Sequence, residues 1–428
     1  MGIATETPES RAERAPRGPF ASQSLLVPAL IVVVGIFAST LPQPQTLGAI
    51  PLRNLLKNEL HKSPDDIAGF MFLIGLFWYI KPLAGVLTDA FPVMGTRRRH
   101  YLLFSAVLAC ASWLLIGVLP HTYNTLLVGC IVLGLFMVMM STVTGALLVE
   151  IGQSRGATGR LTAVRQFTQN ACQLVTGPLG GLLASGAFMF VAGVNALFVV
   201  SIFPVAYYLL REPRSIAAPA VDSFAAAGRQ LRSMAASWPF WFAIVFIGLF
   251  YFAPGIGTVS FFREQNVMHL STRQQGLLVS IYGLGGIVAA VVYGLAVRRV
   301  RIRPLLLVGI VAASVATVGF LWYNDLPSAL ALQLVNGLCF GFAEVALIDL
   351  AARATPAGCE GLGYSCILSM RNLSLFGADK IGAHLSDAFH LGWGTMVWLN
   401  AATTAVVLVL LPLMPRKLMG SRDQPVAS

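Results

Sequence analysis

Four charged side chains lie within long apolar stretches of this sequence, where charges are rare: Lys81, Arg165, Glu344 and Arg371. A charge inside a bilayer costs about 2.5–3.5 kcal/mol on insertion scales, so each one needs a partner or a task. Three of the four are basic, and basic groups bind carboxylates and phosphates. We therefore predict that they bind an anionic solute, with Arg371 as the strongest candidate. For Lys81 the alternative is that its side chain extends toward the lipid headgroups.

Arg165 begins a polar face in the fifth apolar stretch. It is followed at spacings of three and four residues by amide side chains, which one side of a helix would present together: Gln166, Gln169, Asn170 and Gln173. A polar stripe of this kind favours a pore or a neighbouring helix over lipid. Gln169, and Asn372 beside Arg371, are therefore further predicted substrate-binding residues.

Glu344 is the acidic member of the four. An unpaired carboxylate in an apolar setting holds its proton near neutral pH, so Glu344 is a candidate proton carrier as well as a substrate ligand. The alternative is a permanent ion pair with a basic neighbour, and the sequence leaves both open. Asp379, further along the same stretch than Arg371, is the second proton-coupling candidate.

The composition identifies the class of protein that holds these charges. Of 428 residues, 56% are hydrophobic and 11% are charged, with a mean hydropathy of +0.75. Soluble domains carry about 25% charged residues, and apolar runs long enough to cross about 30 Å of hydrocarbon recur throughout this chain. We predict an all-α membrane protein with twelve transmembrane helices, at roughly 25–50, 65–90, 100–119, 123–150, 161–184, 187–210, 238–261, 272–297, 303–322, 327–351, 361–386 and 393–414.

Basic residues are distributed unevenly between the predicted loops. The tails and even-numbered loops hold 20 of the 29 lysines and arginines, whereas the odd-numbered loops hold only Arg53, Lys57, Lys62, Arg263 and Arg273. The positive-inside rule then places both termini in the cytoplasm. The net charge of +11 is thus a topology signal, and we expect no nucleic-acid partner.

A polar segment at 211–236 divides the membrane region into two halves of six helices. We predict a disordered cytoplasmic tail at 1–23, six-helix bundles at 24–210 and 237–414, a cytoplasmic linker at 211–236 and a cytoplasmic tail at 415–428.

Helix breaks fall at matching places in the two halves, at Pro42–Thr46 and at Pro254–Gly257. Interruptions in corresponding segments of two halves point to a transport site, so Gln43 and Gln45 are predicted to bind substrate. The alternative is a packing kink, which a proline produces because it lacks a backbone donor.

A charged hairpin follows the second predicted helix. Gly85-x-x-x-Asp89 ends that helix, and a triple arginine follows after a short turn, made of Arg97, Arg98 and Arg99. Charges at a helix end belong at a bilayer surface, and we predict a cytoplasmic gate here. The corresponding position in the second half carries Arg298 in place of the acid, which predicts an asymmetric latch.

Two further acids end predicted helices and are assigned to the gate. Glu150 ends the fourth helix and Asp349 the tenth, and each is followed by a helix with one internal arginine. We predict latches from Glu150 to Arg165 and from Asp349 to Arg371.

The sequence lacks the residue sets of enzymes. It has no Ser/His/Asp set and no phosphate loop, and its six cysteines have neither metal-ligand nor secreted-disulfide spacing. We therefore expect no catalytic activity, no metal and no cofactor.

The hairpin resembles the signature between helices 2 and 3 of the major facilitator superfamily. Within it, the chain is most similar to the folate–biopterin transporter family, through Leu56-Lys-Asn-Glu-Leu60, Ser63-Pro64, Trp78-Tyr-Ile-Lys-Pro-Leu83, Gly85, Asp89, Phe91-Pro92, Gly95-Thr-Arg-Arg-Arg99, Tyr101, Pro254, Tyr293-Gly294, Pro356-x-Gly358-x-Glu360-Gly361 and Asn372.

This resemblance implies a secondary transporter that works by alternating access, with helices 1, 4, 7 and 10 lining the cavity. The expected solute is small, organic and anionic, resembling folate or a pteridine, and proton coupling is expected with it. We expect a monomer in the lipid bilayer of a bacterial cytoplasmic membrane. The alternatives are a permease for muropeptides or CoA esters, or a non-transporting assembly factor on the same fold.

Overall fold

The computed structural model describes residues 26–62, 67, 70–71, 73–183, 186–212, 220–254 and 256–419. Apart from one isolated bridge between Val93 and Thr96, regular secondary structure in these residues is helical. The helices before the central linker are α2 (Leu26–Thr40), α3 (Ala49–Asn54), the π-helix η1 (Leu55–Glu59), α5 (Leu76–Tyr79), α6 (Lys81–Ala90), α7 (Arg99–Val118), α8 (Tyr123–Ser154), α9 (Thr158–Leu183), α10 (Phe188–Val200) and α11 (Ile202–Tyr208).

The second half of the chain repeats this architecture after a linker helix. Its elements are α12 (Ala220–Ala235), α13 (Trp238–Tyr251), α14 (Gly257–Asn266), α15 (Thr272–Ala296), α16 (Ile302–Gly319), the 3-10 helix η2 (Phe320–Trp322), α17 (Leu326–Ala354), α18 (Glu360–Ala388), α19 (Trp393–Val406), the 3-10 helix η3 (Val407–Leu413) and α20 (Arg416–Met419). The linker predicted at 211–236 therefore contains a helix, α12, which was not predicted from the sequence. The predicted tail at 1–23 and residues 420–428 lie outside the described residues.

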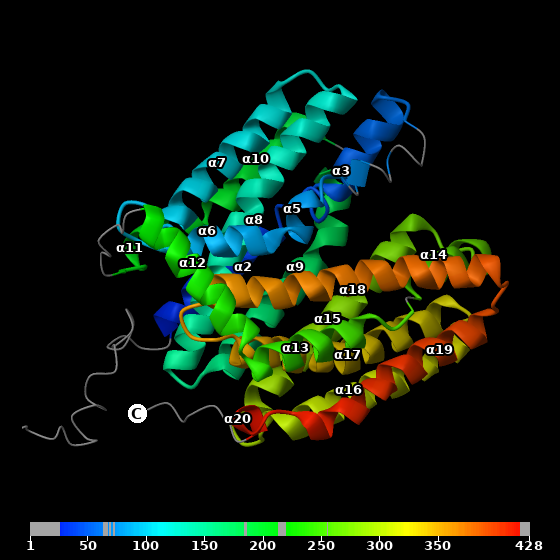
Figure 1. Cartoon of the computed structure of the whole chain (residues 1–428). Coiled ribbons are helices and arrows are strands. Elements are labelled where there is room, and N and C mark those ends of the chain that lie inside the picture. Colours follow the sequence, from blue (N-terminus) through cyan, green and yellow to red (C-terminus); the bar gives the residue numbers. More distant parts are fainter. Residues whose placement is uncertain are drawn as a thin grey trace, which may run out of the picture.

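The helices lie in two groups, α2 to α11 and α13 to α19, which meet at the end where α12 lies and diverge away from it (Figure 1). Between the groups, α9 packs along α15, while α6 and α8 pack against α18. We call the end where the groups meet the Asp89 end, after a residue described below.

Burial follows the position of each helix in these groups. The inner helix α17 is buried without interruption from Val345 to Ala352. The peripheral helix α16 instead exposes a stripe of large apolar side chains, made of Leu307, Val308, Val311 and Val315. Such stripes suit a lipid environment, because apolar side chains can face hydrocarbon. The backbone of the helix needs no water either, since its polar groups are bonded within the helix.

Seven helices among the described residues are long and apolar enough to cross a membrane, or up to eight if a bent pair forms one span. They identify a multi-pass membrane protein. Helices α9 and α18, with 26 and 29 residues, have the length of a span but contain more polar residues. Arg165 of α9 and Arg371 of α18 are among these polar residues.

Both predicted helix breaks are present. Helix α2 ends at Thr40 and α13 ends at Tyr251, each just before its proline. The indole of Trp113 donates to the Pro42 carbonyl over 2.9 Å, and the Asn400 amide donates to the Pro254 carbonyl over 2.8 Å. Protein side chains thus satisfy both carbonyls, as buried backbone at a break requires.

Candidate gate and substrate site

Two glycines bring the helical groups into backbone contact at the Asp89 end. A Cβ atom added to Gly85 of α6 would lie 2.6 Å from the Gly361 carbonyl at the start of α18. A Cβ on Gly361 would in turn lie 2.6 Å from Asp89 Oδ1. Only glycine allows this approach, which explains the first position of the Gly85-x-x-x-Asp89 motif.

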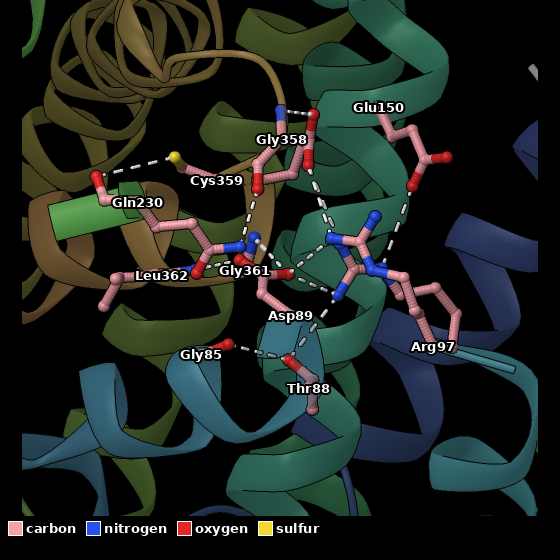
Figure 2. A network of polar contacts seen from close by, with 12 residues as sticks. Gly85, Thr88, Asp89, Arg97, Glu150, Gln230, Gly358, Cys359, Gly361 and Leu362 are labelled. Carbon is pink, nitrogen blue, oxygen red and sulfur yellow. Dashed lines mark hydrogen bonds and ion pairs between the residues drawn. The ribbon is translucent and has the colours of Figure 1, made fainter. Parts of the chain in front are cut away.

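Asp89 occupies the N-terminus of α18, a helix from the opposite half of the chain. Its carboxylate is fully buried and accepts hydrogen bonds from the backbone amides of Gly361, at 3.2 Å, and Leu362, at 2.8 Å (Figure 2). The first amides of a helix lack partners within it and carry partial positive charge, so a carboxylate stabilises them. The predicted gate residue is thus the inter-bundle cap of α18.

Two arginines of the hairpin surround this carboxylate. Arg98 Nη1 lies 2.7 Å from Asp89 Oδ1, and Arg97 Nη2 lies 3.5 Å from the same oxygen. Arg98 also approaches Glu360 Oε2 at 3.9 Å and Glu150 Oε2 at 3.8 Å. Burial alone would lower the pKa of Arg98, but these three carboxylates raise it above its ordinary value, so Arg98 stays charged.

The third arginine lies elsewhere. Arg99 Nη2 donates to the Tyr207 carbonyl over 2.8 Å, and its guanidinium lies over the Tyr207 ring. It therefore ties α7 to α11 instead of joining the carboxylates around Asp89.

Glu212, at the start of the linker, was missed by sequence analysis. Its carboxylate accepts from the backbone amides of Arg97, Arg98 and Arg99 at 3.0, 3.0 and 3.1 Å, and so caps α7. The linker is thereby anchored to the hairpin that carries the gate arginines. Glu212 is separated from these partners by 113 to 115 positions in the sequence, so no local motif could predict the contact.

Besides the contact between α6 and α18, a second contact between the two helical groups joins α8 and α9 to α17. We call these two contacts the seams. Gln153 Nε2 donates to the carbonyls of Ala352 and Thr355, at 2.7 and 2.8 Å, and so caps the end of α17. Asp349, fully buried on α17, lies with Oδ2 at 2.9 Å from where a Cβ on Gly159 would stand, at the start of α9.

Both seams therefore place an acid at the start of a helix from the other group. Asp349, from a neighbouring helix, brings an acid to this contact, while the position that corresponds to Asp89 carries Arg298. The Tyr293 hydroxyl donates to Asp349 Oδ2 over 2.7 Å, and Arg353 Nε donates to Oδ1 over 2.9 Å.

The predicted pairings of Glu150 with Arg165 and of Asp349 with Arg371 are wrong. Glu150 faces Arg98, Asp349 pairs with Arg353, and Arg371 pairs with Glu344. The reason is geometric: the acids end their helices at the Asp89 end, whereas both intramembrane arginines lie further along the next helix.

Glu344 and Arg371 form an ion pair at the centre of the molecule. Glu344 Oε1 accepts from Arg371 Nη2, and Gln166 Nε2 of the other helical group donates to Glu344 Oε2 over 3.0 Å. The Arg371 guanidinium lies 4.6 Å from the centre of the Tyr251 ring, and its Nη1 donates to Asn372 Oδ1 over 3.1 Å. Of the two alternatives for Glu344, the structure has the ion pair.

Lys81 begins α6, directly before Pro82, and points into the protein. It is 4% exposed, and its ammonium donates to Ser141 Oγ of α8 over 2.8 Å. This burial excludes the alternative in which Lys81 extends to the headgroups. The positive charges of Arg165 and Arg371 both act on it. Arg165 itself makes no ion pair or hydrogen bond within the described part of the chain.

The centre also holds polar atoms that are buried yet have no hydrogen-bond partner among the described residues. They belong to α9, α13 and α18, and comprise Gln166 Oε1, Arg371 Nε, Ser369 Oγ and the hydroxyls of Tyr251 and Tyr364. Unsatisfied buried groups are rare in native proteins and mark places where water or a ligand belongs.

The remaining predicted site residues are dispersed. Gln43 donates locally to the Ser39 carbonyl, and neither Gln43 nor Gln45 bonds to the central charges among the described residues. On the polar face of α9, Asn170 packs against Gly286 of α15, so part of that face serves helix packing. Gln169 is half-buried, and the side chain of Asp379 lies outside the described residues.

A cavity of about 360 Å³ lies next to the central ion pair, inside the second helical group. Its walls come from α13 to α19 and η2: Phe250, Tyr251, Ala253, Ile256, Gly257, Tyr282, Thr317, Phe320, Asn336, Phe340, Leu375, Ala378, Asn400 and Thr404. Gly257 belongs to the predicted Pro254–Gly257 break, so this break borders the cavity.

Two packed groups of apolar helices, joined by capped helix ends and enclosing buried charges, define a membrane transporter for a small solute. Residues 20–378 match the sequence model of the Major Facilitator Superfamily, and the chain belongs to this family.

Sequence relatives are of the folate–biopterin type. The chain is 21% identical to a folate-biopterin transporter of Synechocystis sp., over 87% of this chain and 78% of that protein. It is 23% identical to probable folate-biopterin transporter 2 of Arabidopsis thaliana, over 89% and 80% of the two chains. Folate transporter 1 of Plasmodium falciparum is 23% identical over 75% of this chain, and the match spans 65% of that protein's length. The protein is therefore a transporter and not an enzyme.

Solved structures show the same fold. The proton:xylose symporter XylE superposes with a TM-score of 0.68 at 14% identity, covering 94% of this chain and 98% of the symporter. A bacterial homologue of the iron transporter ferroportin, in an outward-facing state, gives 0.67 at 15% identity, covering 90% and 99%.

Proposed function

We propose that this protein is a secondary active transporter that moves a small organic anion, resembling folate or a pteridine, by alternating access. The observation that carries the proposal is the central charge balance: three buried or half-buried cations face one carboxylate. Arg165 and Arg371 are each close enough to repel the charge of Lys81, and Glu344 already pairs with Arg371. An arriving anion would relieve this repulsion.

Glu344 is proposed to couple transport to protons. The substrate anion and Glu344 compete for Arg371, and a proton on Glu344 releases the guanidinium. Proton binding to Glu344 therefore favours substrate binding, and the proton and the substrate cross the membrane in the same direction. Asp379 is retained as a second candidate for this role.

Gln43, Gln45, Gln169 and Asn372 are proposed as further substrate contacts. The hydrogen bond from Arg371 to Asn372 Oδ1 supports Asn372, because it holds the amide beside the cation. The other three would reach the substrate as the helical groups move.

The gate is proposed to be cytoplasmic and closed in this conformation. The basic residues of the tails and even-numbered loops support an orientation with both termini, and hence the Asp89 end, inside the cell. Asp89, Arg97, Arg98, Glu150 and Asp349 then hold the cytoplasmic side shut, while Arg99 stabilises the hairpin.

The proposed architecture has twelve membrane helices in two bundles, at 24–210 and 237–414, joined by the linker at 211–236. The protein would act as a monomer in a bacterial cytoplasmic membrane. The matched relatives carry folate or folate–biopterin names, which favours this branch over permeases for muropeptides or CoA esters and over a non-transporting assembly factor.

The test is uptake into proteoliposomes of folate and of p-aminobenzoyl-glutamate, with and without an inward proton gradient. We expect wild-type uptake to rise with the gradient, Arg371→Gln to lose uptake at least about tenfold, and Glu344→Gln to bind substrate but no longer respond to the gradient. Unchanged uptake by Arg371→Gln would refute the anion site. A gradient response retained by Glu344→Gln would refute its coupling role.

A further inference from the structure

The cavity in the second helical group lies next to the central ion pair. On α17, Asn336 and Phe340 line the cavity and precede Glu344 by two turns and one turn on the same face. On α18, Leu375 and Ala378 line it and follow Arg371 by about one and two turns, or about 6 and 10 Å along the axis.

Tyr251 forms the partition between the two regions. The Arg371 guanidinium lies 4.6 Å from the centre of the Tyr251 ring, and Tyr251 also forms part of the cavity wall. It is 3% exposed, and its buried hydroxyl lies beside the side chains of Arg371 and Glu344, on the side of the ion pair. Tyr251 therefore offers its ring, and not its hydroxyl, to the cavity.

The cavity walls select for a flat ring. Phe250 and Phe340 lie with their ring centres 5.5 Å apart, and Tyr251 meets Phe340 edge-to-face at 6.1 Å, so aromatic faces cover one side. Such surfaces stack on planar rings. A volume of about 360 Å³ is at the lower end of small-molecule sites, so it holds one part of a ligand with the rest outside.

Polar groups at the rim would fix the edge of such a ring. The Asn336 amide lines the cavity and makes no hydrogen bond within the part of the chain that the structure describes. The Asn400 amide instead is already used on the Pro254 carbonyl, and Thr404 donates to the Asn400 carbonyl. The Asn336 amide is thus available to bond the edge of a ring in the cavity.

We propose that this cavity is the ring subsite of the transporter: it binds a planar, hydrogen-bonding heteroaromatic ring, while the substrate's negative charge reaches Arg371, Arg165 and Lys81. This inference rests on the proposed function and deepens it. The two parts of one substrate are bound by different residues. Asn336 and the rings of Phe250, Tyr251 and Phe340 bind the planar ring, and the cations bind the anion. Specificity for the ring therefore resides in the second helical group alone.

Two half-molecules separate the parts. Pterin is a planar, hydrogen-bonding ring without a carboxylate, and p-aminobenzoyl-glutamate carries the carboxylates without the bicyclic ring. Binding of each to purified protein is measured by titration calorimetry on wild type, Asn336→Leu, and the double variant Glu344→Gln/Arg371→Gln. The double variant is used because removing one partner of a buried ion pair alone risks misfolding.

We expect Asn336→Leu to weaken pterin binding at least about tenfold and to leave p-aminobenzoyl-glutamate unchanged, since it removes hydrogen bonds and keeps volume. The double variant should do the reverse. Ala378→Met, which fills the cavity from α18, should also weaken pterin. Asn124→Leu, the same change at an exposed position of α8, is the control and should affect neither probe.

The failures are distinguishable. If p-aminobenzoyl-glutamate binds wild type but pterin does not, or if pterin binds a monodisperse Asn336→Leu and Ala378→Met protein as it does wild type, the ring subsite is refuted and the anion proposal stands. If pterin binds but p-aminobenzoyl-glutamate does not, the anion site is refuted and the ring subsite stands. If neither binds wild type, both are overturned.

Discussion

Asp89 of α6 accepts a hydrogen bond from the backbone amide of Leu362 of α18, 2.8 Å away and 273 residues later in the sequence. Helix α18 has no side-chain cap of its own, because its N-cap residue, Cys359, makes no such bond. A residue of the first helical group thus completes a helix of the second. Separating the helical groups would leave Asp89 without the amides of Gly361 and Leu362, and would leave these amides without an acceptor. These hydrogen bonds therefore stabilise the closed end.

Replacing Asp89 with Asn should weaken this closure. Asparagine keeps the shape but removes the charge that faces Arg98 and the positive end of α18. We expect the closed state to lose about 2–4 kcal/mol and the Asp89 end to open more often. The measurement is the rate at which N-ethylmaleimide modifies Cys359 in protein whose other five cysteines are alanine.

The control for that variant is Asp325→Asn. Asp325 also caps a helix, accepting from the Ser328 amide over 2.9 Å, but at an exposed site outside the gate. It should leave Cys359 labelling unchanged. Equal labelling of the Asp89→Asn variant and wild type would contradict the role assigned to Asp89.

Gly361→Ala should prevent full closure. The new Cβ would stand 2.6 Å from Asp89 Oδ1, which belongs to a buried ion pair with Arg98, and overpacking of this kind costs about 1–3 kcal/mol. We expect transport to fall and Cys359 labelling to rise. Gly377→Ala, on the same helix, meets no atom within 4 Å and should behave like wild type. Matching effects of the two changes would show that helix propensity, and not the contact, is responsible.

Cys359 should report the gate through its pH dependence. Burial, with help from the charges of Glu360 and Asp89, raises the pKa of its thiol from 9.0 to about 11. Because only the thiolate reacts, alkylation at pH 8 should be about a hundredfold slower in the closed state than in unfolded protein. The closed state favours the protonated thiol, so the contribution of Cys359 to its stability is full below pH 9 and is lost as pH rises from about 9 to 11. A rate as fast as that of the unfolded chain would contradict this.

Glu212→Ala should destabilise the fold without touching the central charges. Three backbone amides at the start of α7 lose their shared acceptor, which we expect to cost about 1–2 kcal/mol. Thermal unfolding followed by intrinsic fluorescence measures the loss. Glu59→Ala, which removes an exposed carboxylate from η1, serves as the matched control. A midpoint unchanged from wild type would show that water replaces the cap.

Several features were predictable from the sequence because local chemistry determines them. The apolar composition predicts membrane helices, and Pro42 and Pro254 predict the breaks that the structure has, because a proline cannot continue the backbone hydrogen bonding. The glycine and acid of the hairpin indicated the gate and the family. Charge type alone also singled out Glu344, but it left open whether this carboxylate is unpaired or in an ion pair.

Only the tertiary structure decided which partners these residues take. Asp89 meets Gly361, Gln166 reaches Glu344, and Asp349 meets Gly159, each across hundreds of residues or between helical groups. Spacing along a chain fixes neighbours within one helix but not which helix lies opposite. That choice depends on how glycine-lined faces pack together, and it is why the pairings proposed for Glu150 and Asp349 failed while the charges themselves were found.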